Sequence, residues 1–515
     1  MKRKHAIQDS WLYRHRYPIA GVVLALIAAF MVSYRFWDVP TGLSQAEIES
    51  AATTVELYGN NPILHPTSHT ALLANLPWHV AQWLSVKLLG LSVMSLRLPA
   101  VLLTLMSVAL LIFLIRRLIR PSMAMMTGLL LVSSSFMITI ARSGTPAAMV
   151  TLLLILLLIC AYYVLSATGV RRRVAVVGLT VTSGLMCYMS GGVYILLMLL
   201  LVAVLHPQTR LIIRRGCRLI PLIIVGMVVI TLPLIIAIAH SLISGTSVNS
   251  AVSLLLPGVP TLGGLADCLL AYAGLQASVV GGLITPMMTV VGAALVVVGL
   301  IYVTATARTS IRFYLLAGLI VLALVLGSCN PDFVYLLFVP TIILEAAALS
   351  YITSQWYGLF PNNPYARVFA IVPIAILIGS LCSVDASRYF NAASYNSMVV
   401  YSYDQTLPVL VDFIKDNDDV SLGVVVPDSR DKYMLCSYLS TQHDNIEVMD
   451  SMPSGRASVN SASLNSGAKV VTIGHDDVET PDYMVLSDVR TGWTKEDSVV
   501  LRAYTVRANE SDESD

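Results

Sequence analysis

Two carboxylates near the start of the chain could act as a general base. Asp38 directly follows the first apolar stretch, and Glu47 lies within the segment GLSQAEIESA. A carboxylate at a membrane surface can accept the proton of a hydroxyl group during group transfer. Each residue also has a structural alternative: Glu47 completes a capping box with Ser44, and Asp38 can pair with Arg35 at i,i+3. Both stay candidates for catalysis.

A small number of basic side chains could bind an anionic substrate on the side of the membrane where Asp38 and Glu47 are expected. Arg142 is the best candidate for a phosphate, because a guanidinium can donate to two phosphate oxygens at once. Its alternative is to anchor a helix end at the membrane surface. Lys87 and Arg97 flank a junction between amphipathic segments, where they could bind lipid headgroups or a lipid carrier, or anchor the interface.

Histidines suggest a weaker site. His65 is a candidate for substrate binding, and His69 follows it at the i,i+4 spacing of some metal ligands. Pro66 disfavours a helix that contains both histidines, and no third ligand lies near them in the sequence. We therefore predict no metal site and no firmly required cofactor, although a divalent metal stays possible.

The composition is that of a polytopic membrane protein. The chain is 56% hydrophobic and 12% charged, whereas soluble proteins have about 25% charged residues. Residues 1–387 contain 22 Lys and Arg and 9 Asp and Glu, while residues 388–515 contain 10 and 21. The C-terminal part is therefore an acidic, water-soluble domain without the basic face of a nucleic-acid binder.

Eleven stretches predict membrane spans, approximately at 18–36, 97–115, 122–140, 146–167, 174–190, 192–206, 218–240, 279–303, 312–329, 333–353 and 368–385. With the N-terminus inside, 18 of the 22 Lys and Arg in this part are cytoplasmic and 4 are outside. A twelfth span at 69–93 would invert every later loop, so we expect two amphipathic helices on the outer surface there. The predicted topology in the plasma membrane is N-terminus in and C-terminus out.

The predicted domain organisation follows from these patterns. The tail alternates between amphipathic and strand-like segments, which predicts a small α/β domain that serves as a scaffold or contacts a partner. The Gly/Ser/Pro-rich segment 241–278 is expected to be a mobile loop. The predicted parts are a basic cytoplasmic N-terminus (1–17), a transmembrane domain (18–387) that includes the extracytoplasmic loop 37–96, the α/β domain (388–508) and an acidic tail (509–515).

A loose set of motifs occurs in order along residues 15–385: GLSQAEIESA, His65–Pro66, LGLSVMSLRLPAVLL, ARSGTPAAM and NPDFVYLLFVP. Together with a long first outer loop followed by many plain spans, this order resembles the GT-C membrane glycosyltransferases. The branch that it resembles most is that of the protein O-mannosyltransferases and aminoarabinose transferases.

This resemblance implies transfer of a sugar from a polyprenyl-phosphate carrier to a protein or glycan acceptor in the cell envelope. A first-loop carboxylate, Glu47 or Asp38, would act as the base, and cationic groups such as Arg142 would hold the leaving phosphate. Membrane lipids are the other expected partners, and nucleic acid is not expected.

The chain departs from the family pattern at three places. Gln45-Ala46 stand where the family usually has Asp-Glu, Pro146-Ala147-Ala148 replace a second acidic position, and Asp332-Phe333 replace a basic residue. An alternative is therefore a catalytically degenerate relative that binds or presents lipid-linked glycans. For Glu345, inside the tenth span, we expect a packing role, because it lies too deep for an outer active site.

Overall fold

The computed structural model describes residues 11–59, 73–119, 121–207, 209–211, 220–244, 258–275, 277–359, 364–426, 429–450, 468–473, 484–491 and 499–506. The chain divides into two compact units. The first comprises Met1–Tyr34, Pro62–Pro77 and Ala100–Phe390, and the second comprises Arg35–Asn61, Trp78–Pro99 and Asn391–Asp515.

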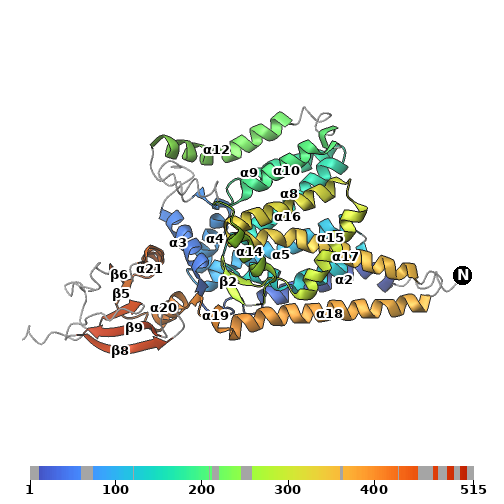
Figure 1. The fold of residues 1–515 in the computed structure, drawn as a ribbon. Coiled ribbons are helices and arrows are strands. Elements are labelled where there is room, and N and C mark those ends of the chain that lie inside the picture. The colour runs from blue at the N-terminus through green and yellow to red at the C-terminus, as the bar shows by residue number, and fades with distance from the viewer. Residues whose placement is uncertain are drawn as a thin grey trace, which may run out of the picture. The chain divides into compact units, whose positions relative to one another are not determined.

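The first unit is built from apolar helices that run side by side (Figure 1). They are α2 (Trp11–Ser33), α5 (Val93–Leu118), α6 (Pro121–Ser133), α7 (Ser135–Arg142), α8 (Ala147–Ser166), α9 (Val170–Met186), α10 (Gly192–Leu205), α12 (Ile220–Ser244), α14 (Leu262–Ala273), α15 (Val290–Thr306), α16 (Ile311–Cys329), η3 (Pro331–Leu337), α17 (Phe338–Leu359) and α18 (Pro364–Tyr395). In the described part, 6 helices are long and apolar enough to cross a bilayer, or 7 if a bent pair counts as one span. The predicted polytopic helical class is thus confirmed, while the count of eleven spans stays a prediction.

A sharp bend interrupts the span that the sequence predicts at 122–140. Helices α6 and α7 meet at an angle of 55°. Between them, Ser134 has an extended backbone and its hydroxyl accepts a hydrogen bond from Met137 N–H at 3.2 Å. Serine hydroxyls compete with the helical ladder in this way, so Ser134 starts a new helix rather than continuing the old one.

The span predicted at 279–303 was wrong in its N-terminal part. The span predicted at 279–303 begins with a hairpin of β2 (Ser278–Val280) and β3 (Leu283–Thr285), and α15 starts only at Val290. Gly281 and Gly282 both have positive φ angles, 55° and 79°, as the tight two-residue turn of a hairpin requires. In addition, the expected mobile loop contains the helix α14, which Thr261 caps by accepting from Gly264 N–H.

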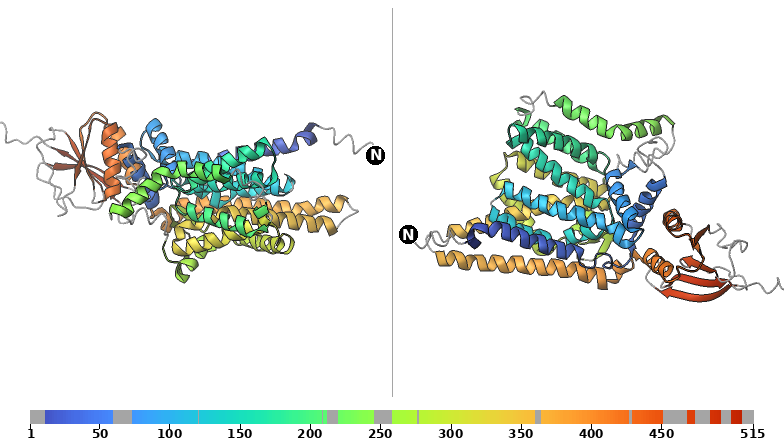
Figure 2. Two further views of the ribbon diagram at one scale, coloured as in Figure 1. Left: turned by 90° about the horizontal axis from the view of Figure 1, so that it is seen from above. Right: turned by 180° about the vertical axis from the view of Figure 1, so that it is seen from behind.

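The second unit contains a mixed five-stranded sheet in the order β6-β5-β7-β9-β8. Strand β5 pairs in parallel with β6 and β7, whereas β9 pairs antiparallel with β7 and β8. Figure 2 shows helices on one face of this sheet. The elements are β1 (Leu43–Ser44), α3 (Gln45–Gly59), α4 (Leu76–Leu89), α19 (Ser397–Val400), β4 (Tyr403–Asp404), α20 (Thr406–Asp416), β5 (Leu422–Val426), α21 (Arg430–Gln442), β6 (Ile446–Asp450), β7 (Lys469–Ile473), β8 (Met484–Thr491) and β9 (Val499–Val506).

One hydrophobic core joins α3 and α4 to the C-terminal residues. Ile48 and Val55 of α3 and Val86 of α4 belong to the same buried cluster as Phe413 of α20 and Leu439 of α21. Strands β1 and β4 pair antiparallel beside it. The sequence-based division assigned 37–96 to the transmembrane domain, whereas the structure packs most of this loop with the residues of the predicted α/β domain.

Candidate functional site

The capping box predicted at the start of α3 is confirmed. Ser44 N–H donates to Glu47 Oε2 at 2.8 Å, and Glu47 N–H donates to Ser44 Oγ at 3.3 Å. Two backbone donors that the first turn of a helix leaves unsatisfied are thereby paired with side chains.

Glu47 also forms a buried ion pair with Arg97. Arg97 Nε donates to Glu47 Oε1 at 2.8 Å and its Nη2 donates to Oε2 at 3.0 Å, with exposed fractions of 0% for Arg97 and 1% for Glu47. The same guanidinium donates to the carbonyls of Phe36, Pro40 and Gly42. Arg97 therefore fixes the turn before α3, and both residues have a structural function. Their roles in catalysis and substrate binding stay predictions.

Arg142 holds together the ends of three helices in the first unit. Its Nη2 donates to the carbonyls of Met31 at 2.9 Å and Tyr34 at 2.6 Å, at the C-terminal end of α2. Its guanidinium carbon lies 4.7 Å from the ring centre of Phe390 and 5.5 Å from that of Tyr389. An arginine in this position satisfies carbonyls that the end of a helix leaves open. Binding of phosphate by Arg142 stays a prediction.

The other predicted cation, Lys87, lies on an exposed apolar face of α4. Its Nζ is 5.0 Å from the centre of the Trp83 ring. Val80, Leu84 and Leu88 recur at i,i+4 on this helix and are all exposed. Such a stripe is typical of a helix that lies in a membrane interface.

His65 and His69 lie outside the described residues.

Asp38 lines the polar cavity of the second unit. The cavity has a volume of about 630 Å³ and is lined by Arg35, Asp38, Val39, Thr41, Ala393, Ser394, Tyr395, Val400, Gln405 and Thr491. Asp38 is 39% exposed, and its carboxylate accepts from Arg35 Nε at 3.0 Å, as the i,i+3 spacing predicted. Arg35 has a φ of 50°, which lets the chain turn sharply after α2 and present both charges to the cavity.

The walls of this cavity include residues that the sequence did not indicate. Gln405 Nε2 donates to Thr41 Oγ1 at 3.1 Å, although the two residues are 364 positions apart. Hydroxyl and amide groups next to a carboxylate are suited to binding a sugar or another polyhydroxylated ligand. No local pattern could have brought Gln405 or Ser394 to Asp38, because only tertiary packing does so.

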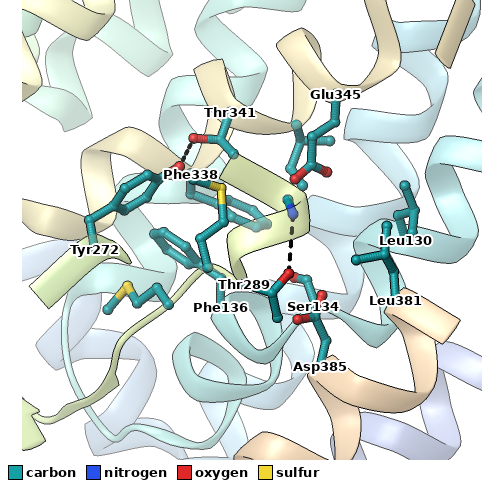
Figure 3. Close-up of a pocket in the computed structure, with 14 residues that line it drawn as sticks. Leu130, Ser134, Phe136, Tyr272, Thr289, Phe338, Thr341, Glu345, Leu381 and Asp385 are labelled. Carbon is teal, nitrogen blue, oxygen red and sulfur yellow. Dashed lines mark hydrogen bonds between the residues drawn. The ribbon is translucent and has the colours of Figure 1, made fainter. Parts of the chain in front are cut away.

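A second carboxylate accompanies Glu345 inside the first unit (Figure 3). Glu345 of α17 is 8% exposed and lines a cavity of about 20 Å³, together with Asp385 of α18 and the helix-capping residues Ser134 and Thr289. The Oδ1 atom of Asp385 is buried, and no described residue donates a hydrogen bond to it. A space of this size is large enough for one water molecule, and its walls combine these polar groups with apolar side chains such as Phe136 and Phe338. Glu345 therefore borders a small cavity of mixed polar and apolar lining, in addition to the packing role expected for it.

A buried hydrogen-bond network joins α3 to α4. Thr54 Oγ1 lies 2.9 Å from His79 Nδ1 and 2.6 Å from Gln82 Oε1, and Trp78 Nε1 donates to Ser50 Oγ at 2.8 Å. Burial lowers the pKa of His79 from 6.5 to about 4, because desolvation penalises the imidazolium. Sequence reasoning did not indicate this network, whose residues are ordinary helix-surface types until packing encloses them.

The depressed pKa of His79 predicts a loss of stability in acid. Between pH 6.5 and pH 4 the unfolded state binds more protons than the native state, so stability falls as the pH is lowered through this window. We expect the free energy of unfolding to be about 2 kcal/mol lower at pH 5 than at pH 7 on account of His79. Urea unfolding followed by tryptophan fluorescence measures this. His79→Gln should reduce the pH dependence by that amount, and an unchanged profile would contradict the assignment.

Among the described residues, no group of three or more His, Cys, Asp or Glu side chains could hold a metal ion. This finding does not extend to the histidines at 65 and 69.

Comparisons with known proteins agree with this architecture. Residues 76–237 match the family model of dolichyl-phosphate-mannose-protein mannosyltransferases. Over the whole fold, the chain is similar to ArnT from Cupriavidus metallidurans in the apo state, with a TM-score of 0.55 and 14% identity over 94% of this chain and 97% of ArnT. The chain has the GT-C fold.

Other GT-C structures show the same similarity. ArnT from C. metallidurans bound to undecaprenyl phosphate gives a TM-score of 0.53 at 14% identity, covering 95% of this chain and 98% of ArnT. The apo oligosaccharyltransferase of Archaeoglobus fulgidus gives 0.51 at 12% identity, covering 85% and 65%. No curated protein sequence matches the chain significantly. The predicted resemblance to the GT-C proteins, and with it a multi-pass membrane protein, is confirmed.

Proposed function

We propose that this protein is a membrane glycosyltransferase that moves a sugar from a polyprenyl-phosphate carrier to a protein or glycan of the cell envelope. The observation that carries this proposal is the polar cavity of about 630 Å³ that contains Asp38. The GT-C fold supports it, as does the structural similarity to an ArnT that was crystallised with undecaprenyl phosphate. A carrier of this kind has its phosphate at the membrane surface and its isoprenoid chain in the bilayer.

The proposed reaction is a displacement at the anomeric carbon of the sugar. Asp38 accepts the proton of the acceptor hydroxyl while the hydroxyl oxygen bonds to this carbon, and the bond from carbon to the carrier phosphate breaks. The phosphate leaves on the carrier with the electron pair of that bond. Arg35 orients the carboxylate through its 3.0 Å hydrogen bond, and Thr41, Ser394 and Gln405 supply hydrogen bonds to the sugar.

The orientation that we propose has the N-terminus in the cytoplasm and the C-terminal domain outside the plasma membrane, with eleven spans. The excess of Lys and Arg in alternate loops supports it. The exposed apolar stripe of α4, with Trp83 and Lys87 beside it, supports an interfacial position for this helix.

A second candidate function is the binding or presentation of lipid-linked glycans without catalysis. Specific contacts favour it: both carboxylate oxygens of Glu47 accept from Arg97, and Arg142 donates to the carbonyls of α2. The substitutions Gln45-Ala46 and Pro146-Ala147-Ala148 favour this second candidate as well. If the protein is catalytic, Asp38 is the carboxylate that best fits the role of base.

The test measures sugar transfer and carrier binding in proteoliposomes supplied with polyprenyl-phosphate sugars. We expect Asp38→Asn to lower the transfer rate by at least about 100-fold, because it removes the general base, while the Kd for undecaprenyl phosphate changes less than about threefold. The matched control is Glu49→Gln, which removes an exposed carboxylate of α3. A wild-type protein that binds the carrier but transfers no sugar would support the second candidate. Full transfer by Asp38→Asn would contradict the role of Asp38.

A further inference from the structure

A second large cavity lies in the first unit, where three helices end. Its volume is about 590 Å³, and its walls are Arg117, Tyr162, Tyr163, Ser166, Ala167, Thr168, Val170 and Arg171. Arg117 belongs to the last turn of α5, Tyr162 to Ser166 to the end of α8, and Arg171 to the first turn of α9. It shares no residue with the cavity of Asp38, and its charged side chains are all cationic.

No carboxylate among the described residues pairs with these arginines. The sequence contains no Asp or Glu between Glu56 and Asp267. Two guanidinium groups line this cavity, and none of its lining residues is acidic. Such a concentration of positive charge favours an anion supplied from outside the chain.

Aromatic rings hold one of these arginines in place. The guanidinium carbon of Arg117 is 5.3 Å from the centre of the Phe113 ring. Phe113 in turn stacks on Tyr163 with ring centres 6.4 Å apart and an interplanar angle of 22°. A cation over an aromatic face is partly ordered before any ligand arrives, so less entropy is lost when the anion binds.

The start of α9 adds a partial positive charge. Gly169, with a φ of 64°, precedes the helix, and no side chain caps the first N–H groups. Space around Gly169 is open, because a Cβ atom there would meet nothing within 4 Å. The helix dipole and the free N–H groups both favour an anion at this end.

The surface next to the cavity is apolar and indicates the source of the anion. Val170, Val174 and Val177 recur at i,i+4 and i,i+3 on α9 and are 72%, 66% and 57% exposed. This stripe starts at the cavity and runs along α9 away from Arg171. A free phosphate would use only the arginines, whereas a phospholipid would place its phosphate at the arginines and an acyl chain along the valines.

We infer that this cavity binds the phosphate headgroup of an anionic phospholipid, with Arg117 and Arg171 as the phosphate ligands. In the orientation proposed above it opens to the inner leaflet, where basic pockets between helices bind such headgroups. The inference does not depend on glycosyl transfer, since it needs only a membrane-embedded chain.

The experiment is a lipid titration of the full-length protein in neutral detergent, with bound lipid counted by native mass spectrometry. The probes are phosphatidylglycerol, phosphatidylcholine and inorganic phosphate. We expect phosphatidylglycerol to bind with one tight site, and Arg117→Gln/Arg171→Gln to weaken it about 10- to 30-fold. The matched control is Arg308→Gln/Arg312→Gln, which removes two exposed arginines at another helix end and should change the affinity less than about threefold.

Other outcomes would overturn the inference. Equal weakening in the two double variants would mean that general surface charge, and not this cavity, attracts the lipid. Displacement of phosphatidylglycerol by inorganic phosphate at equal concentration would identify a site for free phosphate. Equal binding of phosphatidylcholine would remove the requirement for an anionic headgroup. Because both target arginines are exposed, the variants should unfold at the wild-type temperature, and sugar transfer can be assayed separately in the same preparations.

Discussion

Replacing Glu47 with alanine is expected to lower the free energy of unfolding of the second unit by about 3–5 kcal/mol. The substitution removes the carboxylate that accepts two hydrogen bonds from Arg97, whose exposed fraction is 0%. A buried guanidinium that loses its anion keeps the cost of desolvation without the compensating attraction. The capping of α3 by Glu47 is lost as well, which contributes about 1 kcal/mol more.

The control for this prediction removes both charges together. Glu47→Leu/Arg97→Met should recover most of the stability, because replacing a whole buried ion pair with apolar residues is often close to neutral. The alanine variant of the neighbouring exposed Glu49 should change stability by less than about 0.5 kcal/mol. Urea unfolding in detergent, followed by tryptophan fluorescence, measures all three variants. A Glu47→Ala protein as stable as wild type would contradict the structural role of the pair.

This prediction also separates two explanations of any inactive Glu47 variant. If the residue acts only through the fold, activity and stability should fall together, and Glu47→Leu/Arg97→Met should regain both. If Glu47 is also the base, or Arg97 also binds the carrier, the double variant should be stable and still inactive. The predicted catalytic role of Glu47 can thus be tested independently of Asp38.

Local patterns predicted the local part of the candidate site. The capping box of Ser44 and Glu47 and the pair of Arg35 and Asp38 both follow from i,i+3 spacing, and the structure contains both. The partner of Glu47 did not follow, because Arg97 lies 50 positions away and a sequence of one protein contains no signal for that contact.

Long-range packing also decided that α3 and α4 group with the C-terminal residues. Leu91 N–H donates to Gln442 Oε1 across 351 positions, within a core that α3 and α4 share with α20 and α21. The start of α3 was visible in the sequence as a capping box, but the partner on which the helix packs was not. A membrane surface and a soluble domain offer the same kind of apolar contact to an amphipathic helix.

Hydropathy predicted most apolar helices and failed where a helix and a strand have the same composition. Val279, Val280 and Ile284 belong to the hairpin of β2 and β3, yet they are as apolar as the residues of a span. The pair Gly281-Gly282 distinguishes the two structures, because two consecutive residues with positive φ interrupt a helix.

Replacing Arg142 with leucine is expected to destabilise the first unit by about 3–6 kcal/mol. Two carbonyls at the end of α2, those of Met31 and Tyr34, would lose a charged donor, and each such hydrogen bond contributes about 1.5–3 kcal/mol. The attraction to the rings of Tyr389 and Phe390 would be lost as well. Leucine keeps apolar bulk at the site, so the loss reports on the guanidinium.

Lysine at the same position separates the structural role of Arg142 from its predicted binding of phosphate. Arg142→Lys keeps the positive charge but cannot reproduce the planar array of donors. If Arg142 has a structural role, this variant should lose about half as much stability as Arg142→Leu. Its folded molecules should bind undecaprenyl phosphate with an unchanged Kd. A phosphate ligand predicts the opposite: wild-type thermal unfolding and carrier binding weakened at least about tenfold. The control is Arg308→Leu, an exposed arginine for which neither quantity should change. Because Arg142 is 1% exposed and its Nη2 donates to the backbone carbonyls of Met31 and Tyr34, we expect the first outcome.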